Sequence, residues 1–203
     1  MRSSQRNNLR EILDNKDFND RFVSDFKLNF DVTQVKHVGK NISEYNEFTL
    51  VWLKNINRLI SMTPNKYRLS DFHFIDVGCG SSIALIYTCS KFNFKKISGF
   101  DYDSSMIIKS KINLNNKFKN NKFIKVYFSD ASNFFMEEEK VFLFMFNPFG
   151  KEILEKLIKN NLKKLKSTNS IIGYVNDKHI SVLEKLDVKI LRDDKFNLSL
   201  ILF

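Results

Sequence analysis

Hydrophobic and polar residues change their spacing about one third of the way along the chain. Before that point apolar residues recur every three or four positions with no alternating run, which predicts amphipathic helices rather than strands. We expect one or two helices within residues 1–30, a loop at 31–41, and a helix that begins at Ser43 and ends before Pro64. We interpret residues 1–70 as a helical cap over the ligand-binding edge of the domain that follows, not as an independent domain.

Beyond that stretch, short apolar runs alternate with helical patterns, which is typical of a parallel sheet with helices on both faces. The 203 residues suffice for one such α/β domain, which we assign to residues 71–203, together with its N-terminal extension. The last two strands follow one another without a helix, which indicates an antiparallel hairpin. The predicted strands are 72–77, 96–101, 123–128, 140–146, 170–175, 188–191 and 197–203.

The first of these strands runs directly into a glycine turn, Gly78-Cys79-Gly80. Ser81 or Ser82 then stands where the N-cap of the following helix belongs. Strand, Gly-x-Gly and helix form the arrangement that brings a ligand against the backbone at the carboxyl edge of a parallel sheet. Two glycines alone do not identify the ligand, so the class of ligand has to be inferred from the neighbouring residues.

The residues around the turn favour a cationic ligand over a dinucleotide. A dinucleotide site has a third glycine, in the pattern Gly-x-Gly-x-x-Gly, and that position is Ile83. Asp76 precedes the first glycine by two residues, and its carboxylate would repel a pyrophosphate but attract a positive charge. S-adenosylmethionine (SAM) carries a sulfonium and an ammonium and no phosphate. The segment Asp76-Val-Gly78-Cys-Gly80 resembles the first motif of the class I SAM-dependent methyltransferases.

This resemblance implies a fold, a cofactor and an activity. The fold would be a Rossmann-like α/β domain whose seven-stranded, mostly parallel sheet has the strand order 3-2-1-4-5-7-6, with helices on both faces. The cofactor would be SAM, and the activity a SAM-dependent methyl transfer. The resemblance also implies that Asp76, Gly78, Cys79 and Gly80 bind the cofactor.

The second predicted strand ends at Asp101, which follows Asp76 at about the interval, roughly 20 residues, that separates the glycine motif from a ribose-binding carboxylate. A carboxylate can accept strong hydrogen bonds from both ribose hydroxyls. Gly99-Phe-Asp101 also resembles the second motif of the family, so Asp101 and the adjacent Tyr102 are predicted to bind the cofactor. The alternative is that Asp101 serves a turn or a helix cap, although Asp103 already offers a cap.

Two further segments at strand ends complete the candidate site. After the third strand, Asp130 and Ala131 match the place at which the family receives the adenine, with the Asp carboxylate on the exocyclic amine and the Ala N–H beside it. The alternative is a turn Asp. After the fourth strand, Asn147-Pro148-Phe149 is similar to the Asn/Asp-Pro-Pro-Tyr/Phe motif of amino-methyltransferases, with one proline fewer.

In those enzymes the Asn oxygen and a backbone carbonyl accept the hydrogens of an amine, and the aromatic ring stacks on the substrate. Such alignment suits methyl transfer from a sulfonium. The missing proline alters the register of the carbonyl, so methylation of a nucleic-acid base does not follow directly. The alternative for this segment is a Pro-Phe turn that closes the strand. We predict that Asn147, Pro148 and Phe149 face the methyl acceptor.

The remaining titratable residues add few candidates. His179 follows a strand end, His37 lies in the N-terminal loop and His73 lies at the first strand, and each could act as a base toward a hydroxyl acceptor. No His, Cys or Asp set has metal-ligand spacing, so we expect no metal. Cys79 and Cys89 have no CxxC partner, which favours reduced thiols.

The net charge of +10 and the pI near 9.5 suggest a nucleic-acid partner at first sight. Lys, Asn, Ile and Phe are enriched together, however, and the codon bias of an A+T-rich genome produces the same pattern. No apolar run approaches the roughly 18–20 residues that cross a bilayer, and the first residues are polar without an apolar core. We therefore expect a cytoplasmic protein without a transmembrane segment or a secretory signal.

We expect the methyl acceptor to be a nitrogen or oxygen of a small molecule or a glycan precursor. The first alternative is an exocyclic amine of RNA or DNA, which the basic charge would suit. The second alternative is a SAM-binding scaffold without catalytic activity.

Overall fold

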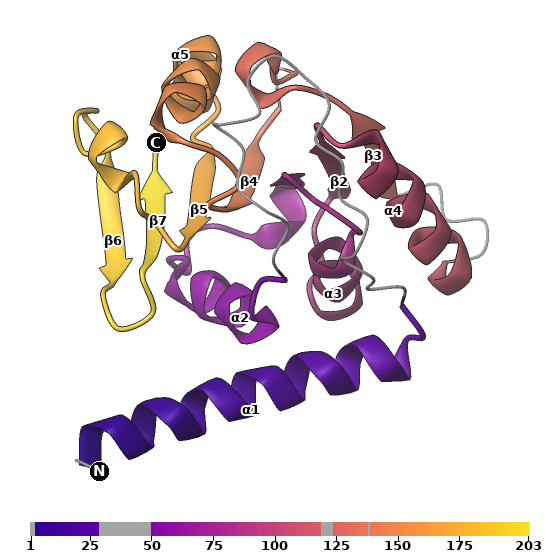
Figure 1. Ribbon diagram of the computed structural model, residues 1–203. Coiled ribbons are helices and arrows are strands. Elements are labelled where there is room, and N and C mark those ends of the chain that lie inside the picture. Colours follow the sequence, from indigo (N-terminus) through magenta and orange to yellow (C-terminus); the bar gives the residue numbers. More distant parts are fainter. Residues whose placement is uncertain (1–2, 29–49, 119–123, 138) are drawn as a thin grey trace.

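The computed structural model describes residues 3–28, 50–118, 124–137 and 139–203 (Figure 1). A seven-stranded sheet with the order β3-β2-β1-β4-β5-β7-β6 forms its centre, which confirms the predicted fold. The first five strands are parallel, and β7 runs antiparallel to both β5 and β6. The strands are β1 (His73–Val77), β2 (Lys96–Asp101), β3 (Ile124–Phe128), β4 (Val141–Phe146), β5 (Ile171–Val175), β6 (Lys189–Asp193) and β7 (Leu198–Leu202).

Helices cover both faces of the sheet, and each face has its own apolar core. On one face α2, α3 and α4 pack against the strands, and α1 lies outside α2 and α3 (Figure 1). The other face is covered by α5 and two short 3-10 turns. The helices are α1 (Ser3–Asp25), α2 (Leu53–Met62), α3 (Ile83–Lys91), α4 (Ser104–Lys117) and α5 (Lys151–Ser167), with 3-10 turns η2 (Leu69–Asp71), η3 (Ala131–Asn133) and η4 (Ile180–Val182).

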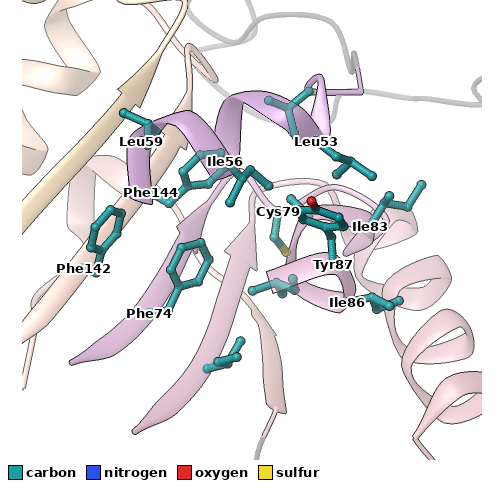
Figure 2. Close-up of a cluster of buried hydrophobic side chains, with 14 of the residues drawn as sticks. Leu53, Ile56, Leu59, Phe74, Cys79, Ile83, Ile86, Tyr87, Phe142 and Phe144 are labelled. Carbon is teal, nitrogen blue, oxygen red and sulfur yellow. The ribbon is translucent and has the colours of Figure 1, made fainter. Parts of the chain in front are cut away.

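The core beneath α2 and α3 consists mainly of aromatic and branched side chains (Figure 2). Phe74 of β1 stacks on both Phe142 and Phe144 of β4, with ring centroids 5.8 and 5.6 Å apart. Every residue of β1, β5 and β7 is buried, as expected for the centre of a sheet that is covered on both faces. No helix in the described ranges is long and apolar enough to span a membrane.

The start of α2 differs from the prediction. The helix begins at Leu53, and the residue before it, Trp52, has an extended backbone. The local sequence supplies no side-chain cap; instead, Asn19 of α1 accepts a hydrogen bond from the Leu53 N–H (3.0 Å) and donates one to the Val51 carbonyl (2.9 Å). A cap from a distant helix leaves no local signal. The predicted cap residue, Ser43, and the loop at 31–41 lie outside the described residues.

The described part of the N-terminal extension forms a layer on one face of the sheet. Residues of α1 and α2 belong to the same apolar core as α3 and the strands, because their hydrophobic stripes face inward. At the ligand-binding edge, where we expected a helical cap, this part of the extension contributes Leu50 and Val51, which line a cavity there.

Gly99, in the middle of β2, allows the segment after β1 to pack directly on the sheet. A Cβ atom at this position would lie 2.7 Å from both Cys79 Cβ and Leu85 Cδ1, and 3.2 Å from the Asp76 carbonyl oxygen. Glycine within a strand often marks such a close approach. The glycine turn and α3 therefore sit closer to β2 than any side chain would permit.

We predict that Gly99→Ala lowers the free energy of unfolding by about 1–3 kcal/mol, because the added methyl group overpacks this contact. Chemical denaturation would measure the change. Gly150→Ala is a suitable control, since Gly150 precedes α5 with a φ of −74°, which alanine adopts without strain. A Gly99→Ala variant as stable as the parent protein would contradict the close packing.

Candidate functional site

Four polar residues predicted to bind ligands gather at one edge of the sheet. Asp76, Asp101, Asp130 and Asn147 lie at or just beyond the carboxyl ends of β1, β2, β3 and β4, respectively. These strands are neighbours and parallel, so their carboxyl ends meet at the same edge. The order β3-β2-β1-β4 places the residues in the sequence Asp130, Asp101, Asp76, Asn147 along that edge.

The glycine turn has a backbone conformation that its two glycines make possible. Gly78 and Gly80 have φ angles of 75° and 50°, in the left-handed region that glycine adopts without strain. The amides of Gly78 and Cys79 both donate to the Phe100 carbonyl (2.9 and 3.0 Å), which ties the turn to β2. A Cβ on Gly78 would lie 2.6 Å from Pro148 Cβ, so Pro148 packs directly on the turn.

The start of α3 is held by α4 rather than by a serine cap. Ser82 occupies the N-cap position, as predicted, but its backbone is left-handed (φ 66°) and its side chain makes no capping bond. Its hydroxyl contacts that of Ser110, and Asn113 Nδ2 donates to the Ser81 carbonyl (2.9 Å). Ser110 and Asn113 are fully buried. Their polar side chains on the inner face of a helix were a signal that sequence reasoning missed.

Asp101 supports the glycine turn while lying at the ligand edge. Its carboxylate accepts a hydrogen bond from the Gly80 amide and one from the Asp103 amide, both 2.8 Å. The cap of α4 is Asp103, whose carboxylate accepts from the Ser105 amide (2.7 Å), so Asp101 does not serve as that cap. Tyr102 stacks on the exposed ring of Phe128, with centroids 6.0 Å apart.

Asp130 lies beyond β3 and caps the 3-10 turn η3. Its carboxylate accepts a hydrogen bond from the Ser132 amide (2.8 Å), which is the turn role that we weighed as the alternative. Ala131 is buried against the core on the α5 side. The adenine-binding role of this pair stays a prediction.

Asp76 is a buried carboxyl group beside a small cavity. The side chain is 3 % exposed, and burial, assisted by the charge of Asp101, raises its pKa to about 8. Ser81 Oγ is also buried and has no hydrogen-bond partner among the described residues. The cavity, of about 30 Å³, is lined by Leu50, Val51, Asp76, Gly78, Cys79, Ser81, Ile83, Ala84, Phe144 and Phe146.

Asn147, beyond β4, is fixed by its backbone and by a neighbouring strand. Its φ is 40°, a left-handed value that asparagine adopts more readily than most residues. Its Oδ1 accepts a hydrogen bond from the hydroxyl of Tyr174 on β5 (3.1 Å). Phe149 is 3 % exposed and packs into the core beneath α5, and its predicted role of facing the acceptor stays a prediction.

The structure separates the candidate histidines. The backbone of His179 lies close enough to the Tyr174 hydroxyl to lower its pKa, against the larger effect of burial, so this residue lies near Asn147. His73 lies at the amino end of β1, away from the ligand edge, where its ring contacts Glu139 (2.5 Å) and Ser98 (2.7 Å). It is therefore not a base for the reaction. His37 lies outside the described residues, and among those described no His, Cys, Asp and Glu side chains gather to hold a metal.

Residues 50–197 match the family model of the ribosomal protein L11 methyltransferases (PrmA). The chain belongs to the PrmA methyltransferase family. It is a SAM-dependent methyltransferase, and SAM is its cofactor, as the first motif indicated. The family match includes α2 but not α1. A comparison with curated proteins found no match.

Solved structures share the fold of this PrmA-family protein. A SAM-dependent methyltransferase from Aquifex aeolicus is 15 % identical, with a TM-score of 0.53 over 73 % of this chain and 87 % of that one. A putative SAM-dependent methyltransferase from Methanococcus maripaludis is 12 % identical, with a TM-score of 0.55 over 74 % and 83 %. A predicted N6-adenine-specific DNA methylase from Listeria monocytogenes is 14 % identical, with a TM-score of 0.54 over 76 % and 51 %.

The raised pKa of Asp76 predicts a stability that depends on pH in this PrmA-family protein. The carboxyl has a pKa near 4 in an unfolded chain and about 8 in the fold, so the folded state binds more protons between these values. Stability is then lost as pH rises from about 4 to 8, by at most about 1.4 kcal/mol per pH unit. Asp76→Asn, which keeps the shape without the charge, should be more stable than the parent protein at pH 8.

Thermal unfolding of the SAM-free protein across this range would test the prediction. The advantage of Asp76→Asn should grow with pH and vanish near pH 4, where both side chains are neutral. A constant difference between the two proteins at every pH would show that Asp76 does not titrate in this window.

Proposed function

We propose that this enzyme transfers the methyl group of SAM to a nitrogen of a small molecule or glycan precursor that is held at Asn147. The observation that carries the proposal is the position of Asn147. Asn147 follows β4, next to the strand that ends in the glycine motif. The residue after it, Pro148, packs directly against Gly78. The acceptor would thus be presented beside the cofactor.

The residues around the glycine turn fit SAM. Asp76 and the buried Ser81 Oγ face a cavity that has room for a group the size of an ammonium or a water, and Phe144 and Phe146 add aromatic walls. A buried carboxyl with a raised pKa regains its charge when a cation binds beside it. When bound, SAM would supply an electrophilic methyl group. The ammonium of its amino acid part would lie beside Asp76 and restore the negative charge of that carboxylate.

The edge residues would hold the rest of the cofactor. The Asp101 carboxylate is fixed by two backbone amides, and a carboxylate has about four lone-pair sites, so it can accept a ribose hydroxyl as well. Asp130 and Ala131 follow β3, the neighbour of β2 in the sheet, and would receive the adenine.

The chemistry around Asn147 favours nitrogen over oxygen as the acceptor. A neutral amine brings its own lone pair and needs alignment, whereas a hydroxyl needs a base to remove its proton. The Tyr174 hydroxyl contacts the Asn147 amide, and burial raises its pKa to about 12, so it holds its proton at neutral pH. A hydrogen-bond acceptor such as Asn147 Oδ1 can align an N–H without removing it.

A second candidate is an amine of a protein, because the family is named for a methyltransferase of ribosomal protein L11. Labelled SAM offered to the small-molecule, protein and RNA fractions of a cell extract would separate the candidates. Label in the small-molecule fraction supports the first, and label in the protein fraction the second. Label in RNA would instead favour the exocyclic amine of a base.

We predict that Asp101→Asn weakens SAM binding by about 1–3 kcal/mol, the effect of losing a charged hydrogen-bond acceptor. Calorimetry with SAM would measure it. Asp103→Asn is the matched control: it lies two residues away and its new amide still caps α4, so SAM affinity should not change. Equal affinities for both variants would remove Asp101 from the cofactor site.

We predict that Asn147→Ala reduces methyl transfer roughly tenfold to a hundredfold, since misalignment of an acceptor has effects of this size. SAM affinity should stay within about twofold of the parent value, because Asn147 would contact the acceptor and not the cofactor. Turnover with the labelled fraction and calorimetry with SAM would give the two values. Full turnover in this variant would overturn the role of Asn147.

A further inference from the structure

We propose that Tyr174 is a positioning residue for methyl transfer, because its hydroxyl fixes the orientation of the Asn147 side-chain amide. The inference rests on the proposed function, in which Asn147 Oδ1 aligns the acceptor. Tyr174 was not among the candidate site residues, since a tyrosine within an apolar strand resembles an ordinary core residue. Only the pairing of β5 with β4 brings its hydroxyl to the end of the neighbouring strand.

The contact lies at the ligand edge but inside the fold. Tyr174 pairs in register with Met145 on β4, and its side chain is 1 % exposed. Its hydroxyl donates to Asn147 Oδ1 at 3.1 Å, and Asn147 is itself 6 % exposed. A buried hydrogen bond of this kind is electrostatically stronger than one in water, so it orients the two side chains that it joins.

The bonding of the hydroxyl determines which end of the amide faces it. The Tyr174 hydroxyl is the donor in its hydrogen bond to Asn147. A donor requires an acceptor, and the only acceptor of a primary amide is its oxygen. Tyr174 therefore holds Oδ1 toward β5 and the Nδ2 group away from it. With the amide fixed in this way, the second lone pair of Oδ1 points in one constant direction.

The side-chain amide is the part of this segment that packing alone leaves undetermined. The backbone of Asn147 is held on its N-terminal side by β4. On its C-terminal side, Pro148 packs against Gly78 and Phe149 is buried in the core. An amide has nearly the same shape in both of its orientations, so steric contacts distinguish them poorly. The hydroxyl of Tyr174 favours one of them, because its proton can be accepted by Oδ1 but not by Nδ2.

The first test compares two buried tyrosines that make the same kind of bond. Tyr174→Phe should reduce methyl transfer to the labelled fraction about tenfold, with SAM affinity unchanged within about twofold. Tyr87→Phe is the matched control, because the Tyr87 hydroxyl donates to Asn57 Oδ1 at 2.8 Å on α2, away from Asn147. Equal turnover in both variants would overturn the proposal.

The second test reads the contact without any acceptor. In Asn147→Asp, the Tyr174 hydroxyl would donate to the new carboxylate and stabilise its charge. The pKa of that carboxyl, followed by carbon NMR, should be about one pH unit lower than in the double variant Asn147→Asp/Tyr174→Phe. Identical pKa values would show that Tyr174 does not act on position 147.

The two tests separate this inference from the function on which it rests. A pKa difference together with full turnover in Asn147→Ala would leave Tyr174 as the partner of Asn147 but remove that residue from the reaction. That outcome would refute the positioning role as well as the role of Asn147. A loss of turnover in Asn147→Ala but not in Tyr174→Phe would refute the positioning role alone.

Discussion

The contact between Pro148 and Gly78 is the constraint on which the ligand edge depends. A single added carbon on Gly78 would come within 2.6 Å of the proline ring, so the segments after β1 and β4 meet with no space between them. One segment carries the glycine turn and the other carries Asn147. Because they touch, the residues proposed to bind the cofactor and those proposed to face the acceptor are held side by side, as a transfer between two bound molecules requires.

The same edge contains groups that reduce the stability of the ligand-free fold. Asp76 is a carboxyl beside a mostly apolar cavity, and Ser81 Oγ is buried without a partner among the described residues. Nearby buried polar side chains are paired: Asn113 donates to the Ser81 carbonyl, and Asp177 accepts from Ser199 and Arg192. A buried carboxyl and an unpaired hydroxyl beside one cavity are typical of a site that serves a ligand rather than maximum stability.

Much of the fold could be predicted from the sequence because its signals are local. Each strand lies within two residues of its predicted bounds, since apolar runs between turn residues define buried strands. The features that could not be predicted depend on tertiary contacts. The cap of α2 comes from Asn19, and the left-handed Ser82 is held by Ser110. Phe149 could equally have faced a ligand or the core, and only the packing of α5 decides.

The hydrogen bonds of Asn19 give α1 a part in the architecture of the cavity. Family resemblance begins at residue 50, so α1 is an addition to the shared methyltransferase domain. Its Asn19 nevertheless binds the Val51 carbonyl, and Val51 forms a wall of the cavity beside Asp76. A chain trimmed to the family boundary would lose the side chain that pairs the Val51 carbonyl and the Leu53 amide next to that wall. The accessory helix thus supports a wall of the cavity beside Asp76, and a domain boundary drawn from the family match would separate the two.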